Sequence, residues 1–194
     1  MPFTLTIVLA AVLASYLRGG RLRRLAEAPL TAPWLLFLGL GLQLAVDLSA
    51  GRGLLGDASL AGVTILVVSQ LLVVAWLGLN RRLPGIGLVA LGLLMNAAAI
   101  AANGAMPVDP QAVRALGLGE LQVPPGKHTL MTDATRLPWL ADVLPLPPLR
   151  SIVSIGDLFI GAGLLPLTHA LMSWRTERER RGRAQRDVSG APVS

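Results

Sequence analysis

Apolar residues are gathered in five blocks along the chain, and more polar segments separate them. A helix that crosses the hydrocarbon core of a bilayer needs about 20 apolar residues, within a range of about 17–25. The blocks meet or approach that length, so the pattern predicts an all-α integral membrane bundle of five transmembrane helices. The predicted spans are residues 3–17, 34–50, 60–79, 85–106 and 152–174, and together they form one domain, residues 1–174.

The connection between the fourth and fifth spans, residues 107–150, is much longer than the others and carries eight of the 14 prolines. Each proline fixes φ and removes a backbone donor, so the segment is stiff and rich in turns. We expect an extracytoplasmic cap that packs against the outer ends of the helices. Asp109 before Pro110 predicts the start of a short helix, and Asp133 predicts a second short turn limited by Pro138.

Basic residues are divided unevenly between the two predicted sides of the membrane. Twelve of the 17 Lys and Arg residues fall in the first loop, the third loop and the C-terminal segment, against five on the other side. The positive-inside rule then places the N-terminus outside a bacterial cell membrane and the C-terminus in the cytoplasm. No basic residue precedes the first block, which disfavours a cleaved signal peptide. Residues 175–194 are expected to form a basic, disordered cytoplasmic tail.

Composition narrows the classes of protein. The chain is 53% hydrophobic, 14% charged and free of cysteine, which excludes a disordered protein, a disulfide scaffold and a thiolate metal site. A net charge of +6 would suit nucleic-acid binding. The excess is an orientation signal on the inner side, however, and the outer side is slightly acidic. The expected partners are therefore the lipid bilayer and anionic lipid at the basic tail, with no nucleic acid.

Polar residues at membrane depth mark candidate functional sites. Asp157 lies five residues into the predicted fifth span, about 7.5 Å along a helix that rises about 1.5 Å per residue. Asp47 and Asn103 also fall near outer span ends, beneath the long loop, where Lys127 or Arg136 would neutralise Asp47 or Asp157. The predicted ligand-binding residues are Asp47, Asn103, Lys127, His128, Asp133, Arg136, Asp142 and Asp157.

Packing between helices is the alternative role for these polar groups, because Asn and Gln side chains often link helices in membranes. Small residues on the fourth and fifth spans would allow close approach: Ala97, Ala98, Ala101, Ala102, Gly156 and Gly161. Asp157 differs, since a carboxylate in mid-helix needs a partner or a proton. We therefore keep a binding role for Asp157 beside the packing role.

Chemistry beyond binding has little support in the sequence. The two histidines, His128 and His169, fall on opposite predicted sides, and no Walker A loop, HExxH or Gly-x-Ser-x-Gly motif is present. We assign no cofactor, metal ligand or catalytic residue. The main hypothesis is a protein that binds a small ligand, lipid or ion, with a role in transport or sensing.

Two other functions stay open. One is an accessory or scaffold subunit of a larger membrane complex, with another membrane protein as partner. The other is an enzyme acting on lipid-linked substrates, in which Asp142 or Asp157 would be the acid or base and Lys127 with His128 would bind phosphate.

Several motifs resemble those of a family of bacterial multi-pass membrane proteins catalogued as a domain of unknown function. They are Arg18-Gly-Gly-Arg-Leu22, Asn103-Gly-Ala-Met-Pro-Val108, Lys127-His128, the Leu137–Pro145 segment and Ser154-Ile-Gly-Asp157. The resemblance covers roughly residues 5–174. It implies a five-helix membrane protein with a site built from the motif residues, and it implies no activity.

Overall fold

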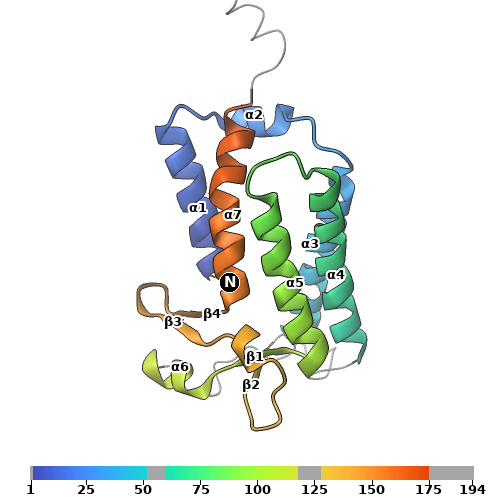
Figure 1. Ribbon diagram of the computed structural model, residues 1–194, viewed down its shortest axis with the longest axis vertical. Coiled ribbons are helices and arrows are strands. Elements are labelled where there is room, and N and C mark those ends of the chain that lie inside the picture. Colours follow the sequence, from blue (N-terminus) through green and yellow to red (C-terminus); the bar gives the residue numbers. More distant parts are fainter. Residues whose placement is uncertain (1, 52–59, 118–127, 175–194) are drawn as a thin grey trace, which may run out of the picture.

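Long helices standing side by side make up most of the protein. The computed structural model describes residues 2–51, 60–117 and 128–174. Within them the long helices are α1 (Pro2–Leu17), α3 (Pro33–Gly51), α4 (Leu60–Leu79), α5 (Ile86–Asn103) and α7 (Ile155–Met172). The short helix α2 (Leu22–Glu27) crosses one end of this bundle, which we call the α2 end (Figure 1).

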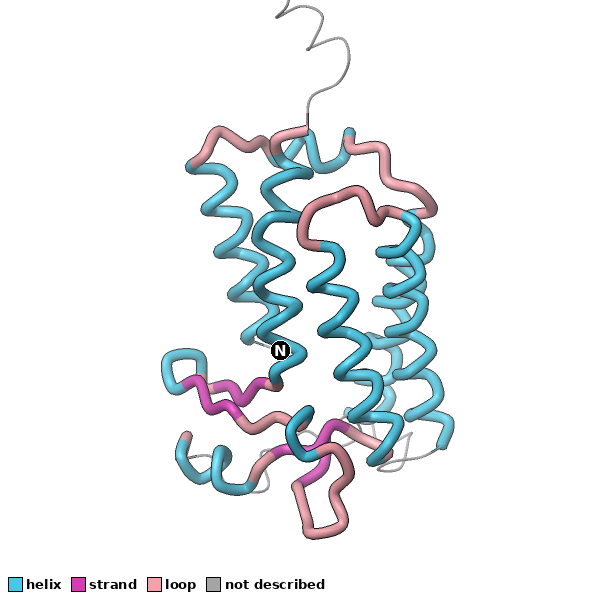
Figure 2. The backbone as a smooth tube through the Cα atoms, in the orientation of Figure 1, coloured by secondary structure: helices cyan, strands magenta, loops and turns pink. Residues whose placement is uncertain are grey.

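The opposite end, which we call the strand end, carries the residues between α5 and α7 (Figures 1 and 2). There β1 (Met106–Val108) pairs in parallel with β2 (His128–Leu130), and β3 (Leu144–Leu146) pairs antiparallel with β4 (Ser151–Val153). Helix α6 (Pro110–Ala115) and the 3₁₀ turns η2 (Pro138–Leu140) and η3 (Pro147–Leu149) complete the segment. These strand pairs were not expected in an all-α chain, because strands of three residues are too short to show an alternating pattern of apolar and polar positions.

Three of the described helices, α4, α5 and α7, are long and apolar enough to cross a membrane. The apolar stretches Leu5–Leu17 and Pro33–Val46 of α1 and α3 are shorter. Helix α4 has the predicted bounds, whereas α5 ends before residue 106 and α7 begins after residue 152. Gly104 explains the first difference, since its φ of 81° and its N–H bond to the Ile100 carbonyl close the helix.

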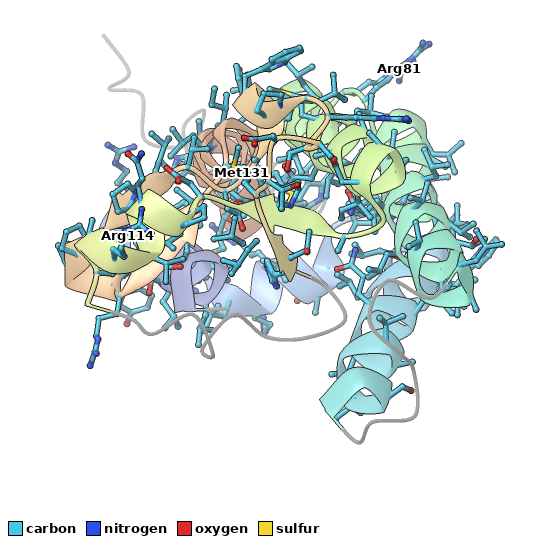
Figure 3. The ribbon with its side chains drawn as sticks, turned by 90° about the horizontal axis from the view of Figure 1, so that it is seen from below. Arg81, Arg114 and Met131 are labelled. Atoms are coloured by element: carbon cyan, nitrogen blue, oxygen red, sulfur yellow. The ribbon has the colours of Figure 1, made fainter. Side chains whose placement is uncertain are left out.

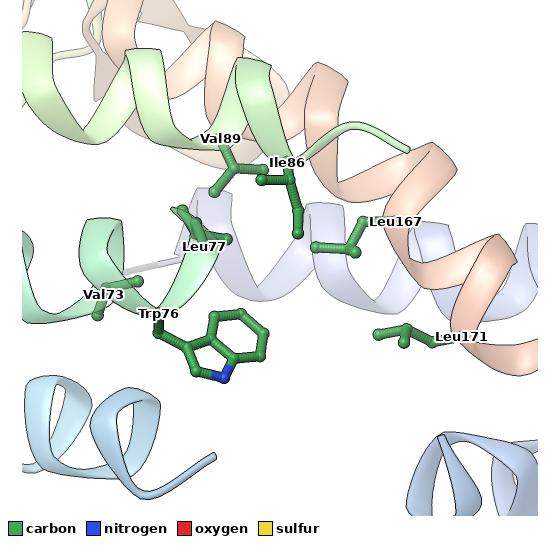
Figure 4. Close-up of a cluster of buried hydrophobic side chains, with 7 residues drawn as sticks. All are labelled: Val73, Trp76, Leu77, Ile86, Val89, Leu167 and Leu171. Carbon is green, nitrogen blue, oxygen red and sulfur yellow. The ribbon is translucent and has the colours of Figure 1, made fainter. Parts of the chain in front are cut away.

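The helices pack in the spatial order α1, α7, α5, α4, α3. The last helix of the chain therefore lies between the first helix and α5 (Figure 1). A buried apolar cluster near the α2 end joins α4, α5 and α7: Val73, Trp76, Leu77, Ile86, Val89, Leu167 and Leu171 (Figure 4). This cluster fixes the three central helices together, and the strand end is built on their opposite ends.

Two pairs of glycines bring the backbones of α5 and α7 into contact. A Cβ on Gly163 would lie 2.5 Å from the carbonyl oxygen of Gly85, and one on Gly156 would lie 2.8 Å from that of Gly92. Real Cβ atoms do not approach backbone oxygens so closely. Because the two pairs are two helical turns apart on both helices, the contact runs along much of the pair.

The close contact differs in detail from the small-residue pattern expected from the sequence. Gly156 packs as predicted, but Gly161 faces α1, where a Cβ would make an ordinary contact at 3.6 Å with Ile7. Gly163 takes the place expected for Gly161. In α5 the alanines Ala98 and Ala101 are exposed, so Gly92 supplies the closest approach instead.

Local signals in the strand-end segment were partly right. Asp109 does cap α6, where its side chain accepts a hydrogen bond from the Gln111 N–H at 2.8 Å, as predicted. The predicted turn at Asp133 does form, since the Thr135 N–H donates to the Thr132 carbonyl at 3.0 Å, but the Asp133 side chain does not cap it. Thr132 makes the local bonds there instead, because its hydroxyl accepts from the Ala134 N–H and its N–H donates to the Thr135 hydroxyl.

Replacing Gly156 by alanine should separate α5 from α7, because the added methyl group overlaps the Asn96 side chain and the Gly92 carbonyl. Overpacking of this kind costs about 1–3 kcal/mol. Gly161→Ala is the matched control in the same helix, and its gain in helix propensity should leave stability unchanged or raised. Thermal unfolding of the detergent-solubilised variants measures both. Equal stability of the two variants would contradict the close contact.

Candidate functional site

The N-terminus of α7 is closed by a capping box between Ser154 and Asp157. The Ser154 hydroxyl accepts a hydrogen bond from the Asp157 N–H at 3.0 Å, and Asp157 Oδ2 accepts one from the Ser154 N–H at 3.1 Å. Asp157 is therefore the third residue of its helix. A carboxylate at this position is favoured by the positive end of the helix dipole.

This geometry corrects the depth expected for Asp157. The apolar pattern predicts a fifth helix that starts at residue 152, which would place the Asp157 carboxylate in mid-helix. Residues 151–153 form β4 instead, and the helix starts after Ser154. The Ser-x-x-Asp spacing of Ser154 and Asp157 is itself a capping signal, so the sequence held the information that locates this helix start.

Asn96 of α5 extends the capping box across the helix pair. Its Nδ2 donates to Asp157 Oδ1 at 2.9 Å, and its Oδ1 accepts from the Ser154 hydroxyl at 3.0 Å. Gly156 leaves room for the amide, because a Cβ there would overlap Asn96 Oδ1. Ser154 is fully buried. The result is a closed network in which both Asp157 oxygens accept hydrogen bonds.

A second acid, Asp142, is held above this network by the backbone. Its N–H donates to the Pro107 carbonyl at 2.8 Å, and its carbonyl accepts from the Asp109 N–H at 2.9 Å. The residue is only 5% exposed. Asp142 Oδ2 lies 3.7 Å from His128 Nε2 of β2. Its other oxygen, Oδ1, is buried and has no hydrogen-bond partner within the described ranges.

The environment of Asp142 disfavours its charged form. Burial and, second, the nearby charge of Asp157 raise the pKa of the Asp142 carboxyl from 3.8 to about 8. At neutral pH this carboxyl therefore holds its proton in most molecules. We call Asp142, Asp157, Asn96, Ser154 and His128 the carboxyl cluster. The cluster joins α5 and α7 to the strand-end segment. In the end-on view this segment lies over the helices, with Met131 near its centre (Figure 3).

Asn103 is close by but is used for structure. Its amide donates to the Ala99 and Arg136 carbonyls, both at 2.8 Å, and its Oδ1 accepts from the Arg136 N–H at 2.7 Å. These bonds tie the end of α5 to the turn that leads into η2. The side-chain amide of Asn103 thus has its capacity filled by backbone groups.

Two other predicted site residues lie outside the carboxyl cluster. Arg136 and Asp133 are exposed, and in the described part of the chain neither side chain has an ion pair. Asp47 belongs to α3, but its side chain lies outside what the structure describes, as does the whole of Lys127. Of the six predicted residues whose side chains the structure describes, it brings three into the cluster: His128, Asp142 and Asp157.

Two members of the cluster, Asn96 and Ser154, were absent from the predicted site. Nothing in the linear sequence links Asn96 to Asp157, and only the three-dimensional contact shows the hydrogen bond between them. The second histidine lies elsewhere, at the α2 end, where its Nδ1 is 3.1 Å from the Ser15 hydroxyl and links α1 to α7. No three His, Asp or Glu side chains of the described residues are grouped as a metal site.

Comparison with known proteins gives a family without a known activity. A model of a family of unknown function, DUF5317, matches residues 27–168. An uncharacterized protein of Thermotoga maritima is 35% identical over 89 residues, which is 44% of this chain and 51% of that protein. The chain thus spans about half the length of this curated relative. No solved structure matches the chain.

The raised pKa of Asp142 makes stability depend on pH in a defined direction. Between pH 3.8 and about 8 the folded protein holds a proton that the unfolded chain releases, so stability falls as pH rises through this window. The slope from this carboxyl is at most about 1.4 kcal/mol per pH unit. Thermal unfolding from pH 5 to pH 9 should show the fall in the native protein and a weaker one in Asp142→Asn. An unchanged slope in that variant would place the titration elsewhere.

Proposed function

The chain belongs to the DUF5317 family, and from this starting point we propose that it is a five-helix integral membrane protein with a ligand-binding site at its strand end. The proposed binding site is the carboxyl cluster. The observation that supports a binding role is the buried Oδ1 of Asp142, which has no hydrogen-bond partner within the described residues.

The apolar exterior of the bundle supports a membrane location for all five helices. Phe37 and Leu44 of α3 are 70% and 57% exposed, and Leu9 and Leu13 of α1 are 58% and 60% exposed. Exposing such large apolar side chains to water is unfavourable in free energy, whereas the hydrocarbon of a bilayer would cover them without this cost. Because α1 lies along α7 and α3 along α4, the two helices with shorter apolar stretches occupy the same layer as the three candidate membrane-spanning helices.

Charge supports one orientation of this bundle. Exposed arginines gather at the α2 end, namely Arg18, Arg21, Arg23, Arg81 and Arg82. The positive-inside rule assigns such an end to the cytoplasm and leaves the strand end outside a bacterial cell membrane. The basic residues that follow α7 in the sequence would add to the attraction of anionic lipid at the cytoplasmic surface.

A buried polar atom without a partner is costly, about 1–3 kcal/mol, and native proteins keep few of them. Asp142 Oδ1 is such an atom, and it lies beside an acid and a histidine rather than in an apolar core. A bound molecule that donates a hydrogen bond to Oδ1 would remove this cost. The cluster is therefore better suited to hold a ligand than to act only as a link between helices.

The orientation can be tested by labelling, because the native chain has no cysteine. A membrane-impermeant maleimide should label Asp133→Cys in intact cells and Arg82→Cys only after the membrane is opened. The two positions are exposed, and they belong to the β2–η2 and α4–α5 connections, which lie at opposite ends of the bundle (Figure 1). The reverse pattern would invert the orientation, and labelling of both in intact cells would contradict a spanning bundle.

The binding site can be tested by native mass spectrometry of the full chain released in its own lipids. The native protein should carry a bound molecule of defined mass, and Asp142→Asn should lose at least about nine-tenths of it, since a hydrogen bond to a charged group contributes about 1.5–3 kcal/mol. Asp109→Asn is the matched control, because asparagine caps a helix equally well. Equal occupancy in both variants would disprove a site at Asp142.

A further inference from the structure

The hydrogen-bond capacity of the carboxyl cluster limits what can bind there. Asp157 accepts bonds from Asn96 and from the Ser154 backbone, and the Asn96 amide oxygen accepts from the Ser154 hydroxyl. The open position is an acceptor, Oδ1 of Asp142. The ionised form of this carboxyl only accepts hydrogen bonds, so a ligand that binds the ionised form must be a donor.

The charge of the cluster points to a cationic donor. Two carboxyl groups lie close enough for the charge of Asp157 to disfavour ionisation of Asp142. In the described ranges no arginine forms an ion pair with either of them. A charge-assisted hydrogen bond is about twice as strong as a neutral one, and a positive ligand would also relieve the repulsion between the two acids.

A metal ion fits this arrangement less well than an ammonium group. A bound metal needs several ligands converging on one point, and the described residues contain no group of three His, Asp or Glu placed for it. A primary ammonium carries three N–H donors and can be held by one or two acidic oxygens, with the remaining donor in water.

We propose that the carboxyl cluster binds a primary ammonium group, with Asp142 Oδ1 as the charged acceptor. This inference rests on the proposed membrane protein with a binding site at the strand end. The ammonium can belong to an aminophospholipid headgroup or to a free amine. Trp139, exposed in η2 at the same end, suits the headgroup level of a bilayer, where a phospholipid amine would also lie.

Binding requires Asp142 to exchange its proton for the ligand. The carboxyl releases one proton to solvent, and the ammonium keeps all three of its own. Because the pKa of Asp142 is about 8, the ionised fraction rises about tenfold per pH unit below that value. His128 on β2 and Asp157 on α7 face the group, and the other contacts of Asp142 are with backbone groups of Pro107 and Asp109.

The experiment uses the full chain in nanodiscs that contain equal amounts of phosphatidylethanolamine and phosphatidylcholine. The phosphatidylcholine headgroup also carries a positive nitrogen, but that nitrogen has no N–H. Native mass spectrometry should show retained phosphatidylethanolamine in about tenfold preference, at least, on the native protein. The preference should be lost in Asp142→Asn and kept in Asp109→Asn. It should also be larger at about pH 8 than at about pH 6.

Two further measurements distinguish a lipid ligand from a soluble amine, and a wrong ligand class from a wrong proposed function. Loss of the retained lipid on addition of free ethanolamine identifies a soluble amine as an equal ligand, whereas resistance identifies the lipid. Equal retention of the two lipids by the native protein, without displacement by ethanolamine, overturns the ammonium assignment. If phosphatidylglycerol carried over from the cell membrane is retained instead and Asp142→Asn releases it, the binding site stands and only its ligand class is wrong. If the native protein holds nothing in nanodiscs or in its own lipids, the proposed function fails as well.

Discussion

The close contact between α5 and α7 is the constraint on which the strand end depends. Glycines at Gly85, Gly92, Gly156 and Gly163 remove the side chains that would hold the two backbones apart. Only at that separation can Asn96 reach across to the capping box of α7. In the proposed membrane setting there is no hydrophobic driving force between helices, so close packing and interhelical hydrogen bonds would stabilise the helix pair. The polar network and the glycine contact therefore support each other.

The two acids at this end have opposite environments, and that difference gives the cluster its chemical character. Asp157 is at a helix N-terminus with a bond to each oxygen, so its charge is compensated. Asp142 is buried on an irregular segment, with its backbone bonded and one carboxyl oxygen unpartnered in the described structure. A buried acid whose pKa is raised by burial and by a neighbouring charge is typical of functional sites. Here one acid organises the helix pair and the other stays available.

Sequence patterns were sufficient for the helices but not for the site. Long apolar blocks locate α4 within its observed bounds, because helices of this length leave a strong signal. The Asp109-Pro110 pair likewise locates α6. Hydrophobicity alone could not separate β4 from the start of α7, since Ile152 and Val153 are as apolar as a membrane span. The Ser-x-x-Asp spacing of Ser154 and Asp157 predicts the observed start of α7, whereas the apolar pattern predicts a start at residue 152.

The site residues were harder because they depend on contacts between segments far apart in the sequence. Asp142 and His128 belong to one loop, and they come together because β1 pairs with β2 and Val108 bridges to Asp142. The charge of Asp157, from a different segment, acts on Asp142. Backbone hydrogen bonds hold these strand pairings together, and such bonds leave no residue-specific pattern in the sequence. The same bonds bury the Asp142 carboxyl and so create its altered acidity. The raised pKa of Asp142 is thus a consequence of the backbone hydrogen bonds that hold the loop at the end of α5. Because these bonds form only in the folded structure, the sequence alone could not predict this pKa.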